Sequence, residues 1–218
     1  MEPIALPAEP SALLEAGFIV LSIGVAALFV LWTGHRGLAA GWLLLTGGAT
    51  AAGLLQSFAL PPRMMIVFFA ALIGLTTLAW RSDWHTRPMV FLVGLQSFRI
   101  LVEIAIHQAV VEGVAPPQMT WTGRNLDIVT GVGALLLAPF ATKLPAWSLH
   151  LWNAIGLGLL VNVVSVAVLS MPTPFQVFEP DNVWVVFFPF SWLPLVLVIM
   201  AWLGHVVLFK RLLEDGRR

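Results

Sequence analysis

Residues 89–111 read MVFLVGLQSFRILVEIAIHQAVV, an apolar run long enough to cross a bilayer that carries Gln96, Arg99, Glu103 and His107. On a helix, where successive residues turn by about 100°, these four side chains fall within an arc of roughly 80°. We call them the polar stripe. Burying an ionised side chain at the bilayer centre costs about 2.5–3.5 kcal/mol on insertion scales, so such residues usually face the protein interior. The stripe therefore predicts an interior polar site in a helical membrane bundle.

The composition predicts the class of protein. Hydrophobic residues make up 59% of the chain, charged residues 10%, and the mean hydropathy is +0.93. Because ordinary soluble domains have a charged fraction of about 25%, we expect an integral membrane protein with the lipid bilayer as its first partner. The net charge is zero and no basic run occurs, so nucleic acid is not an expected partner. The absence of cysteine excludes disulfides, thiolate metal sites and a cysteine nucleophile.

Apolar stretches of about 20 residues predict the number of membrane spans. The sequence contains seven, at Leu13–Thr33, Ala39–Leu60, Met64–Trp80, Met89–Val111, Leu126–Leu144, Leu149–Leu169 and Trp184–Phe209. The connections are short apart from Glu112–Asn125 and Ser170–Asn182. We therefore predict an all-α fold, a polytopic transmembrane bundle of seven helices that forms a single domain over residues 1–218.

The basic residues predict the orientation, because cytoplasmic loops of membrane proteins carry an excess of Lys and Arg. With the N-terminus outside, only Arg63 and Arg124 lie on the outer side. The inner side then collects eight basic residues, namely Arg36, Arg81, Arg87, Lys143, Lys210, Arg211, Arg217 and Arg218. This bias predicts an outer N-terminus, a cytoplasmic C-terminus and a multi-pass protein of the inner cell membrane. Both long loops would then face outward.

The polar residues outside the stripe predict the extent of the site. With a rise of about 1.5 Å per residue, Gln56 and Asn162 reach the outer part of their helices, and Asp127 opens the fifth helix at the outer surface. We expect these groups to line one cavity that opens to the outer side. The predicted binding residues are Gln56, Arg99, Glu103, His107, Arg124, Asn125, Asp127 and Asn162.

Each of these residues also has a structural interpretation. Arg99 and Glu103 are spaced i, i+4 and can neutralise each other as a bridge between helices. His107 suits an interfacial belt, and Gln56, Asn153 and Asn162 suit interhelical hydrogen bonds. Pro189 and Pro194 should bend or loosen the last helix, because proline lacks a backbone N–H.

Metal and haem sites are weaker hypotheses, and the sequence indicates no cofactor. Glu103 and His107 lie on successive turns and are candidate metal ligands, but a catalytic metal needs about three protein ligands, so a carboxylate such as Asp127 would have to complete the set. A bis-histidine haem would require His150 and His205 to face each other near the inner surface. Nucleophile elbows, phosphate-binding loops and dinucleotide fingerprints are missing.

Three strings carry a loose resemblance to a known group of proteins. They are Ser97-Phe98-Arg99-Ile100 with Glu103, then Gly123-Arg124-Asn125-Leu126-Asp127, then Pro172-Thr173-Pro174-Phe175. Together they resemble multi-pass bacterial membrane proteins that carry no assigned activity. The resemblance would cover most of the chain, and it implies a membrane bundle without implying any chemistry.

Two classes of function remain open at this stage, and a third is structural. In the first, the cavity binds or transports a small polar or anionic solute or ion through Arg99 and Arg124, while Glu103 exchanges a proton. In the second, the protein is an intramembrane enzyme of hydrolase type acting on a lipid-derived or periplasmic substrate, with Glu103, Asp127 and His107 as the candidate catalytic residues. In the third, smooth helix faces dock another membrane protein or a second copy of the chain. The residues favour binding or transport over catalysis.

Overall fold

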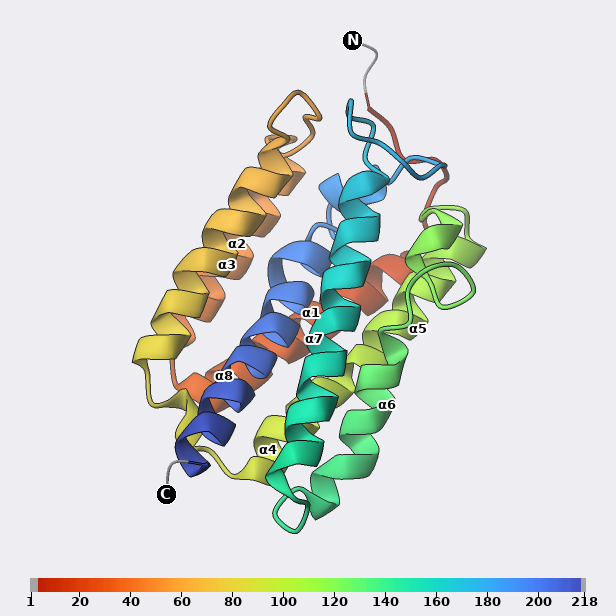
Figure 1. The fold of residues 1–218 in the computed structure, drawn as a ribbon. Coiled ribbons are helices and arrows are strands. Elements are labelled where there is room, and N and C mark those ends of the chain that lie inside the picture. The colour runs from red at the N-terminus through yellow and green to blue at the C-terminus, as the bar shows by residue number, and fades with distance from the viewer. Residues whose placement is uncertain (1–3, 217–218) are drawn as a thin grey trace.

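The computed structural model describes residues 4–216, and every regular element in that range is helical (Figure 1). Five helices are long and apolar enough to cross a membrane: α1 (Ala12–Thr33), α3 (Arg63–Arg81), Met89–Val111, α7 (Ala146–Leu169) and Leu193–Asp215. The predicted all-α class is confirmed, and the helices fit a multi-pass membrane protein. Arg217 and Arg218, which entered the orientation argument, lie outside the described residues.

The helix that carries the polar stripe has three parts. It consists of α4 (Met89–Gly94), a 3-10 turn (Leu95–Ser97) and α5 (Phe98–Val111). Gln96, Arg99 and Glu103 are at most 2% exposed, whereas Leu101 and Ile104 on the opposite face are more than half exposed. The prediction that the stripe faces the protein interior is therefore confirmed for these three residues. His107, one turn further on, is half-buried.

Two of the predicted spans form helices that are shorter than expected. The second is α2 (Arg36–Ala51), which is followed by a turn where Gly53 adopts a left-handed φ of 71°. The fifth is α6 (Ile128–Leu137), which tightens into a 3-10 turn at Ala138–Phe140 around Pro139. A helix needs about 20 residues to cross the hydrocarbon core, so neither element alone matches the full span predicted from hydropathy.

The last span differs most from the prediction, because regular helix begins at Leu193 and not at Trp184. Residues Trp184–Val186 form a 3-10 turn, a set of turns follows, Leu193–Val198 is a π-helix, and α8 covers Ile199–Asp215. We call Leu193–Val198 the π segment. Pro189 and Pro194 lack the N–H groups that a regular helix needs, which explains the late start. The indole of Trp42 on α2 donates to the carbonyl of Leu195 over 2.7 Å, so it satisfies one backbone group of the π segment.

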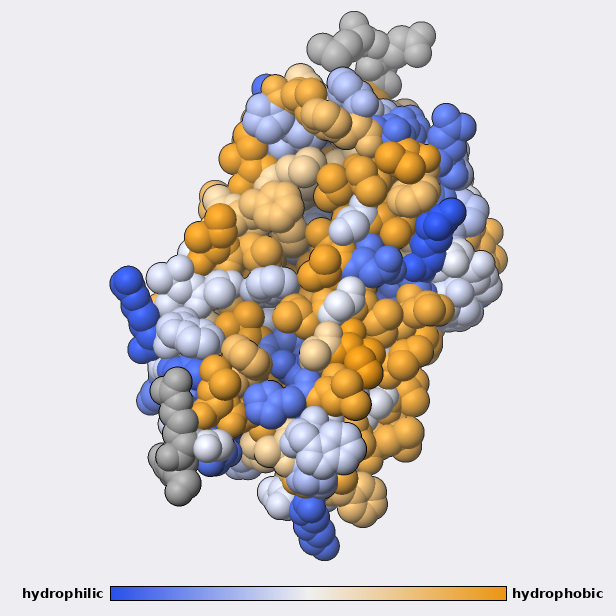
Figure 2. Space-filling model, in the orientation of Figure 1, coloured by the Kyte–Doolittle hydropathy of each residue, from blue (hydrophilic) through white to orange (hydrophobic). Residues whose placement is uncertain are grey.

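The helices place two sets of connections at opposite ends of the bundle (Figure 1). The segment before α1 lies with the loops that follow α5 and α7, where the Ser11 hydroxyl donates to Glu112 over 2.8 Å. At the other end, Arg87 donates to the carbonyl of Trp32 over 3.0 Å and Lys210 to that of Trp80 over 2.9 Å. Apolar side chains dominate the flank between these ends (Figure 2). α8 packs between α3 and α7 in the middle of the bundle.

The carboxylate of Glu112 tethers the N-terminal segment and should make it sensitive to acid. Hydrogen bonds from the Gln108 side chain and from the Ser11 backbone lower the pKa of Glu112. A carboxyl whose pKa is lowered in the folded state contributes stability above its unfolded pKa, and that contribution is lost as the pH falls through the folded pKa. We expect the Ser11 amide to exchange hydrogen faster at acidic pH, beyond the intrinsic pH effect, and Glu112→Gln to remove this response. Glu9→Gln in the same segment is the control, and an unchanged response in Glu112→Gln would contradict the tether.

Candidate functional site

A bidentate ion pair between Arg99 and Asp127 forms the centre of the site. Arg99 Nε donates to Asp127 Oδ2 over 2.6 Å, and Arg99 Nη2 donates to Asp127 Oδ1. Both side chains are buried. The contact joins Arg99 on α5 to the residue that precedes α6. The fork geometry of guanidinium and carboxylate makes this pair the strongest polar contact between the two helices.

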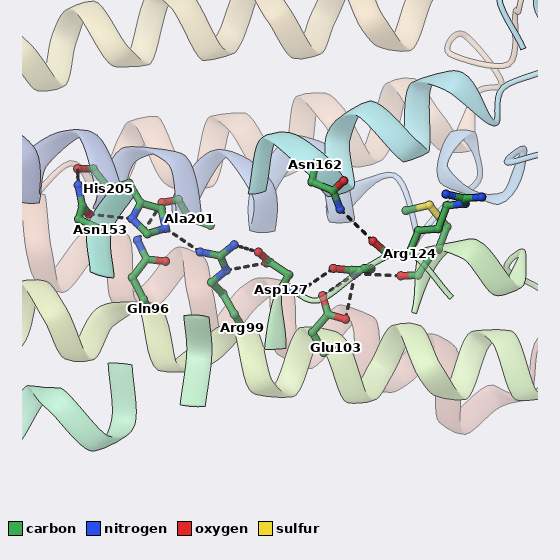
Figure 3. A network of polar contacts seen from close by, with 11 residues as sticks. Gln96, Arg99, Glu103, Arg124, Asp127, Asn153, Asn162, Ala201 and His205 are labelled. Carbon is green, nitrogen blue, oxygen red and sulfur yellow. Dashed lines mark hydrogen bonds and ion pairs between the residues drawn. The ribbon is translucent and has the colours of Figure 1, made fainter. Parts of the chain in front are cut away.

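His205 on α8 extends the network beyond the ion pair (Figure 3). Arg99 Nη1 lies 2.7 Å from His205 Nε2, and His205 Nδ1 lies 2.8 Å from Asn153 Oδ1. A guanidinium can only donate, so Nε2 is the acceptor and Nδ1 carries the proton, which makes this imidazole neutral. Gln96 donates from Nε2 to the carbonyl of Ala201 over 2.9 Å. The network therefore joins α5, α7 and α8.

Glu103 is held by an amide and not by Arg99. Asn125 Nδ2 lies 2.8 and 2.9 Å from the two Glu103 oxygens and 2.9 Å from the carbonyl of Met119. Its Oδ1 accepts the backbone N–H of Asp127 over 2.9 Å, an Asx turn that leads into α6. The i, i+4 bridge between Arg99 and Glu103 is not formed, because Asp127 occupies the guanidinium fork. Arg99 and Glu103 belong to one site with separate partners.

The structure brings some predicted residues together and leaves others at the surface. Arg99, Glu103, Asn125 and Asp127 converge, as expected. Arg124 is exposed, with its guanidinium carbon 4.5 Å from the centroid of the Phe178 ring, and its carbonyl accepts from Asn162 over 2.9 Å. These two residues form a surface contact near the network and do not belong to its buried part (Figure 3).

Two further predicted residues lie apart from the network. The ring of His107 stacks on Trp121 at a centroid distance of 4.3 Å, and its Nδ1 is 3.4 Å from the hydroxyl of Thr120. These contacts hold His107 apart from Glu103 and Arg99. Gln56 follows α2 and makes no side-chain hydrogen bond to the network within residues 4–216.

A cavity of about 70 Å³ lies against the charged groups, and we call it the central cavity. Arg99, Glu103 and Asp127 line it on one side, and apolar side chains from α3, α5, α7 and the π segment form most of the remainder. At the end of the bundle where the N-terminal segment lies, the cavity is closed by Met119, Met171 and Val185. Each of these residues is at most 5% exposed. The cavity is therefore closed at this end, where the sequence had predicted its opening.

The half-exposed lining residues show where the cavity opens. They lie on α3 (Met65), on α7 (Val164, Ala167 and Val168) and on the π segment (Pro194 and Val198). The mouth thus lies between α3 and α7 on the flank seen in Figure 2. Ile66, Phe69 and Val161 beside the mouth are between 40% and 52% exposed. Exposed apolar side chains of this kind are suited to lipid contact.

The geometry gives little support for metal or haem binding. Among residues 4–216, no group of three His, Asp or Glu side chains is close enough to hold a metal ion. Both ring nitrogens of His205 have protein partners, Arg99 and Asn153, which leaves neither free to bind the iron of a bis-histidine haem with His150.

The sequence reasoning missed His205 as a site residue, because counting from Lys210 places it toward the inner side. The length of the arginine side chain and its tilt toward the inner end close the gap between the two residues. A single histidine within the apolar run Ile199–Phe209 was the available signal. Asn153 was considered only as interhelical glue, and it is the residue that fixes the tautomer of His205.

Comparisons with protein-family models, with curated proteins and with solved structures find no match. The resemblance to multi-pass bacterial membrane proteins therefore stays a prediction from the three sequence strings.

The Arg99–Asp127 pair should show strong coupling in a double-mutant cycle. Removing one partner leaves a buried charge unpaired, which costs about 3–5 kcal/mol, whereas removing both leaves none. We expect Arg99→Met and Asp127→Leu each to lower the unfolding midpoint in mild detergent by more than the double variant does. The pair Arg99→Met with Glu103→Gln is the control and should show much weaker coupling. Additive losses at Arg99 and Asp127 would contradict the bidentate pair.

Gly156 on α7 should be essential for the position of His205. A Cβ at this position would lie 2.6 Å from His205 Cε1 and 2.6 Å from Thr130 Cγ2. Overpacking of this kind costs about 1–3 kcal/mol, so we expect Gly156→Ala to lower the thermal unfolding midpoint. Gly158→Ala, two residues on with no atom within 4 Å, should leave it unchanged. Equal midpoints for the two variants would show that α7 does not pack on His205 as described.

Proposed function

We propose that this protein is a multi-pass protein of the inner cell membrane that binds a small molecule or ion in the central cavity, with Glu103 as the main protein contact. In this proposal all seven helices belong to the membrane bundle, with the N-terminus outside and the C-terminus in the cytoplasm. The orientation is supported by the bundle ends: Arg36, Arg81, Arg87 and Lys210 lie at the end away from the N-terminal segment.

The proposal rests on the charges of the side chains around Glu103. Within the buried network, Arg99 is paired twice with Asp127 and His205 is neutral, so the charges of Arg99 and Asp127 cancel. Glu103 then adds a carboxyl that has a neutral amide as its hydrogen-bond donor. Membrane proteins rarely keep an ionisable group at this depth without a function, because its burial is costly. A ligand that supplies a donor or a positive charge would complete the site.

These charges also change the class of ligand that we propose. An anionic solute was expected to bind Arg99 and Arg124, but Asp127 occupies the fork of Arg99 and Arg124 lies at the surface on Phe178. A ligand that binds a carboxylate is therefore favoured over an anion. The apolar closure by Met119, Met171 and Val185 also favours binding over passage of a hydrophilic solute from the outer side.

Binding is favoured over catalysis as well. A hydrolase of the predicted kind would use His107 beside Glu103, whereas His107 stacks on Trp121 and no hydrogen bond joins it to Glu103 among the described residues. General acid–base chemistry needs the partners within hydrogen-bond reach.

Mass spectrometry of copurified small molecules tests the proposal. The wild-type protein, Glu103→Gln and Glu179→Gln are extracted in mild detergent without added ligand, and the compounds retained by each are compared. Glu179→Gln is the control, because it makes the same substitution at an exposed position in an outer loop away from the cavity. We expect at least one compound to be retained by the wild type and Glu179→Gln and lost from Glu103→Gln. Identical retained compounds in all three folded proteins would contradict a ligand site at Glu103.

A further inference from the structure

The mouth of the central cavity opens into the hydrocarbon region of the proposed membrane. The residues that line the mouth on α3, α7 and the π segment are all apolar, and Ile66, Phe69 and Val161 beside it are exposed apolar residues. A hydrophilic solute would have to cross lipid to reach this opening, and its polar groups would lose their hydrogen bonds to water there. A molecule that is already dissolved in the bilayer meets no such barrier. The position of the mouth therefore selects for ligands that partition into membranes.

The volume of the cavity limits which part of such a ligand it can hold. A cavity needs about 10–15 Å³ to hold one water molecule, so the central cavity of about 70 Å³ accommodates a small group of several heavy atoms. A long chain would not fit beside Glu103. It would have to leave through the mouth and lie between α3 and α7, against Met65, Val164 and Val168.

The hydrogen-bond inventory of Glu103 specifies the chemistry of that small group. A carboxylate has about four acceptor positions. The two hydrogens of Asn125 Nδ2 are shared among the two Glu103 oxygens and the carbonyl of Met119. Acceptor capacity on Glu103 thus exceeds what its donor supplies, and Glu103 lines the cavity. A head group with several N–H donors and a positive charge satisfies both the spare acceptors and the uncompensated charge.

We propose that the ligand is an amphiphile with a protonated amine as its head and a long apolar chain, which enters sideways from the bilayer between α3 and α7. Its ammonium group pairs with Glu103 inside the cavity, and its chain lies in the mouth along α7. This inference rests on the proposed function, because it names the ligand class of the same site.

Photolabelling in vesicles tests the ligand class. The full chain is reconstituted in phosphatidylcholine vesicles with a long-chain primary amine that carries a photoreactive diazirine in its chain, or with the carboxylic acid of the same chain. After irradiation, labelled peptides are mapped by mass spectrometry. We expect the amine to label residues at the mouth on α3 and α7, and the acid to label the lipid-facing helices without this preference.

Variants separate binding at Glu103 from partition into lipid. Loss of one partner of a desolvated charge pair weakens binding strongly, so Glu103→Gln should reduce mouth labelling by about tenfold or more. Glu179→Gln should leave it unchanged. Ala167 is half-exposed at the mouth, so Ala167→Phe should also reduce mouth labelling. This variant tests the inference if Glu103→Gln does not fold.

The remaining outcomes overturn the inference in different ways. Equal mouth labelling by the amine and the acid would exclude recognition of a cationic head. Displacement of the probe by ethylamine from the aqueous phase, as effectively as by the unlabelled long-chain amine, would show access from water and exclude an amphiphile. Either result would leave the proposed function intact if Glu103→Gln still loses its copurified compound. If labelling is unchanged in Glu103→Gln and Ala167→Phe, and the copurified compounds are unchanged as well, both proposals are overturned.

Discussion

The ion pair between Arg99 and Asp127 is the constraint to which the rest of the site responds. A guanidinium in the interior of a membrane bundle needs a carboxylate partner and acceptors for its other N–H groups. Asp127 supplies the carboxylate from the start of α6, and His205 supplies an acceptor from α8. Asn153 on α7 then fixes His205 through its Nδ1. One charged residue thereby sets the relative positions of α5, α6, α7 and α8.

Close approach of the helices makes this network possible. Gly156 lets α7 come within contact of the His205 ring, and Gly204 lets α8 approach the Gln96 amide. Small residues at helix contacts are common in membrane bundles, where packing and polar contacts replace the hydrophobic effect between helices. Here they also shape the polar network, because a larger side chain at either position would move one of its members.

The central cavity arises from two local departures from regular helix. Asn125 turns the loop before α6 so that its amide reaches Glu103, and the prolines of the last segment delay regular helix until Leu193. The π segment then lines the cavity between α3 and α7. As a result, Arg99, Glu103 and Asp127 lie inside the cavity and apolar residues line its mouth. This polarity is the reason for inferring an amphiphile with its head inside.

The sequence by itself determined the membrane class, the positions of the hydrophobic helices and the inward direction of Gln96, Arg99 and Glu103. These follow from composition and from the angular period of a helix, both of which are local properties. Proline and glycine at residues 53, 139, 189 and 194 changed the helix ends, which hydropathy does not measure. Only the tertiary structure decided that Arg99 pairs with Asp127 and not with Glu103, that His205 joins the site, and that the cavity opens between α3 and α7. Partner choice depends on which helices are neighbours and how far each side chain reaches, and neither is encoded in the spacing along one helix.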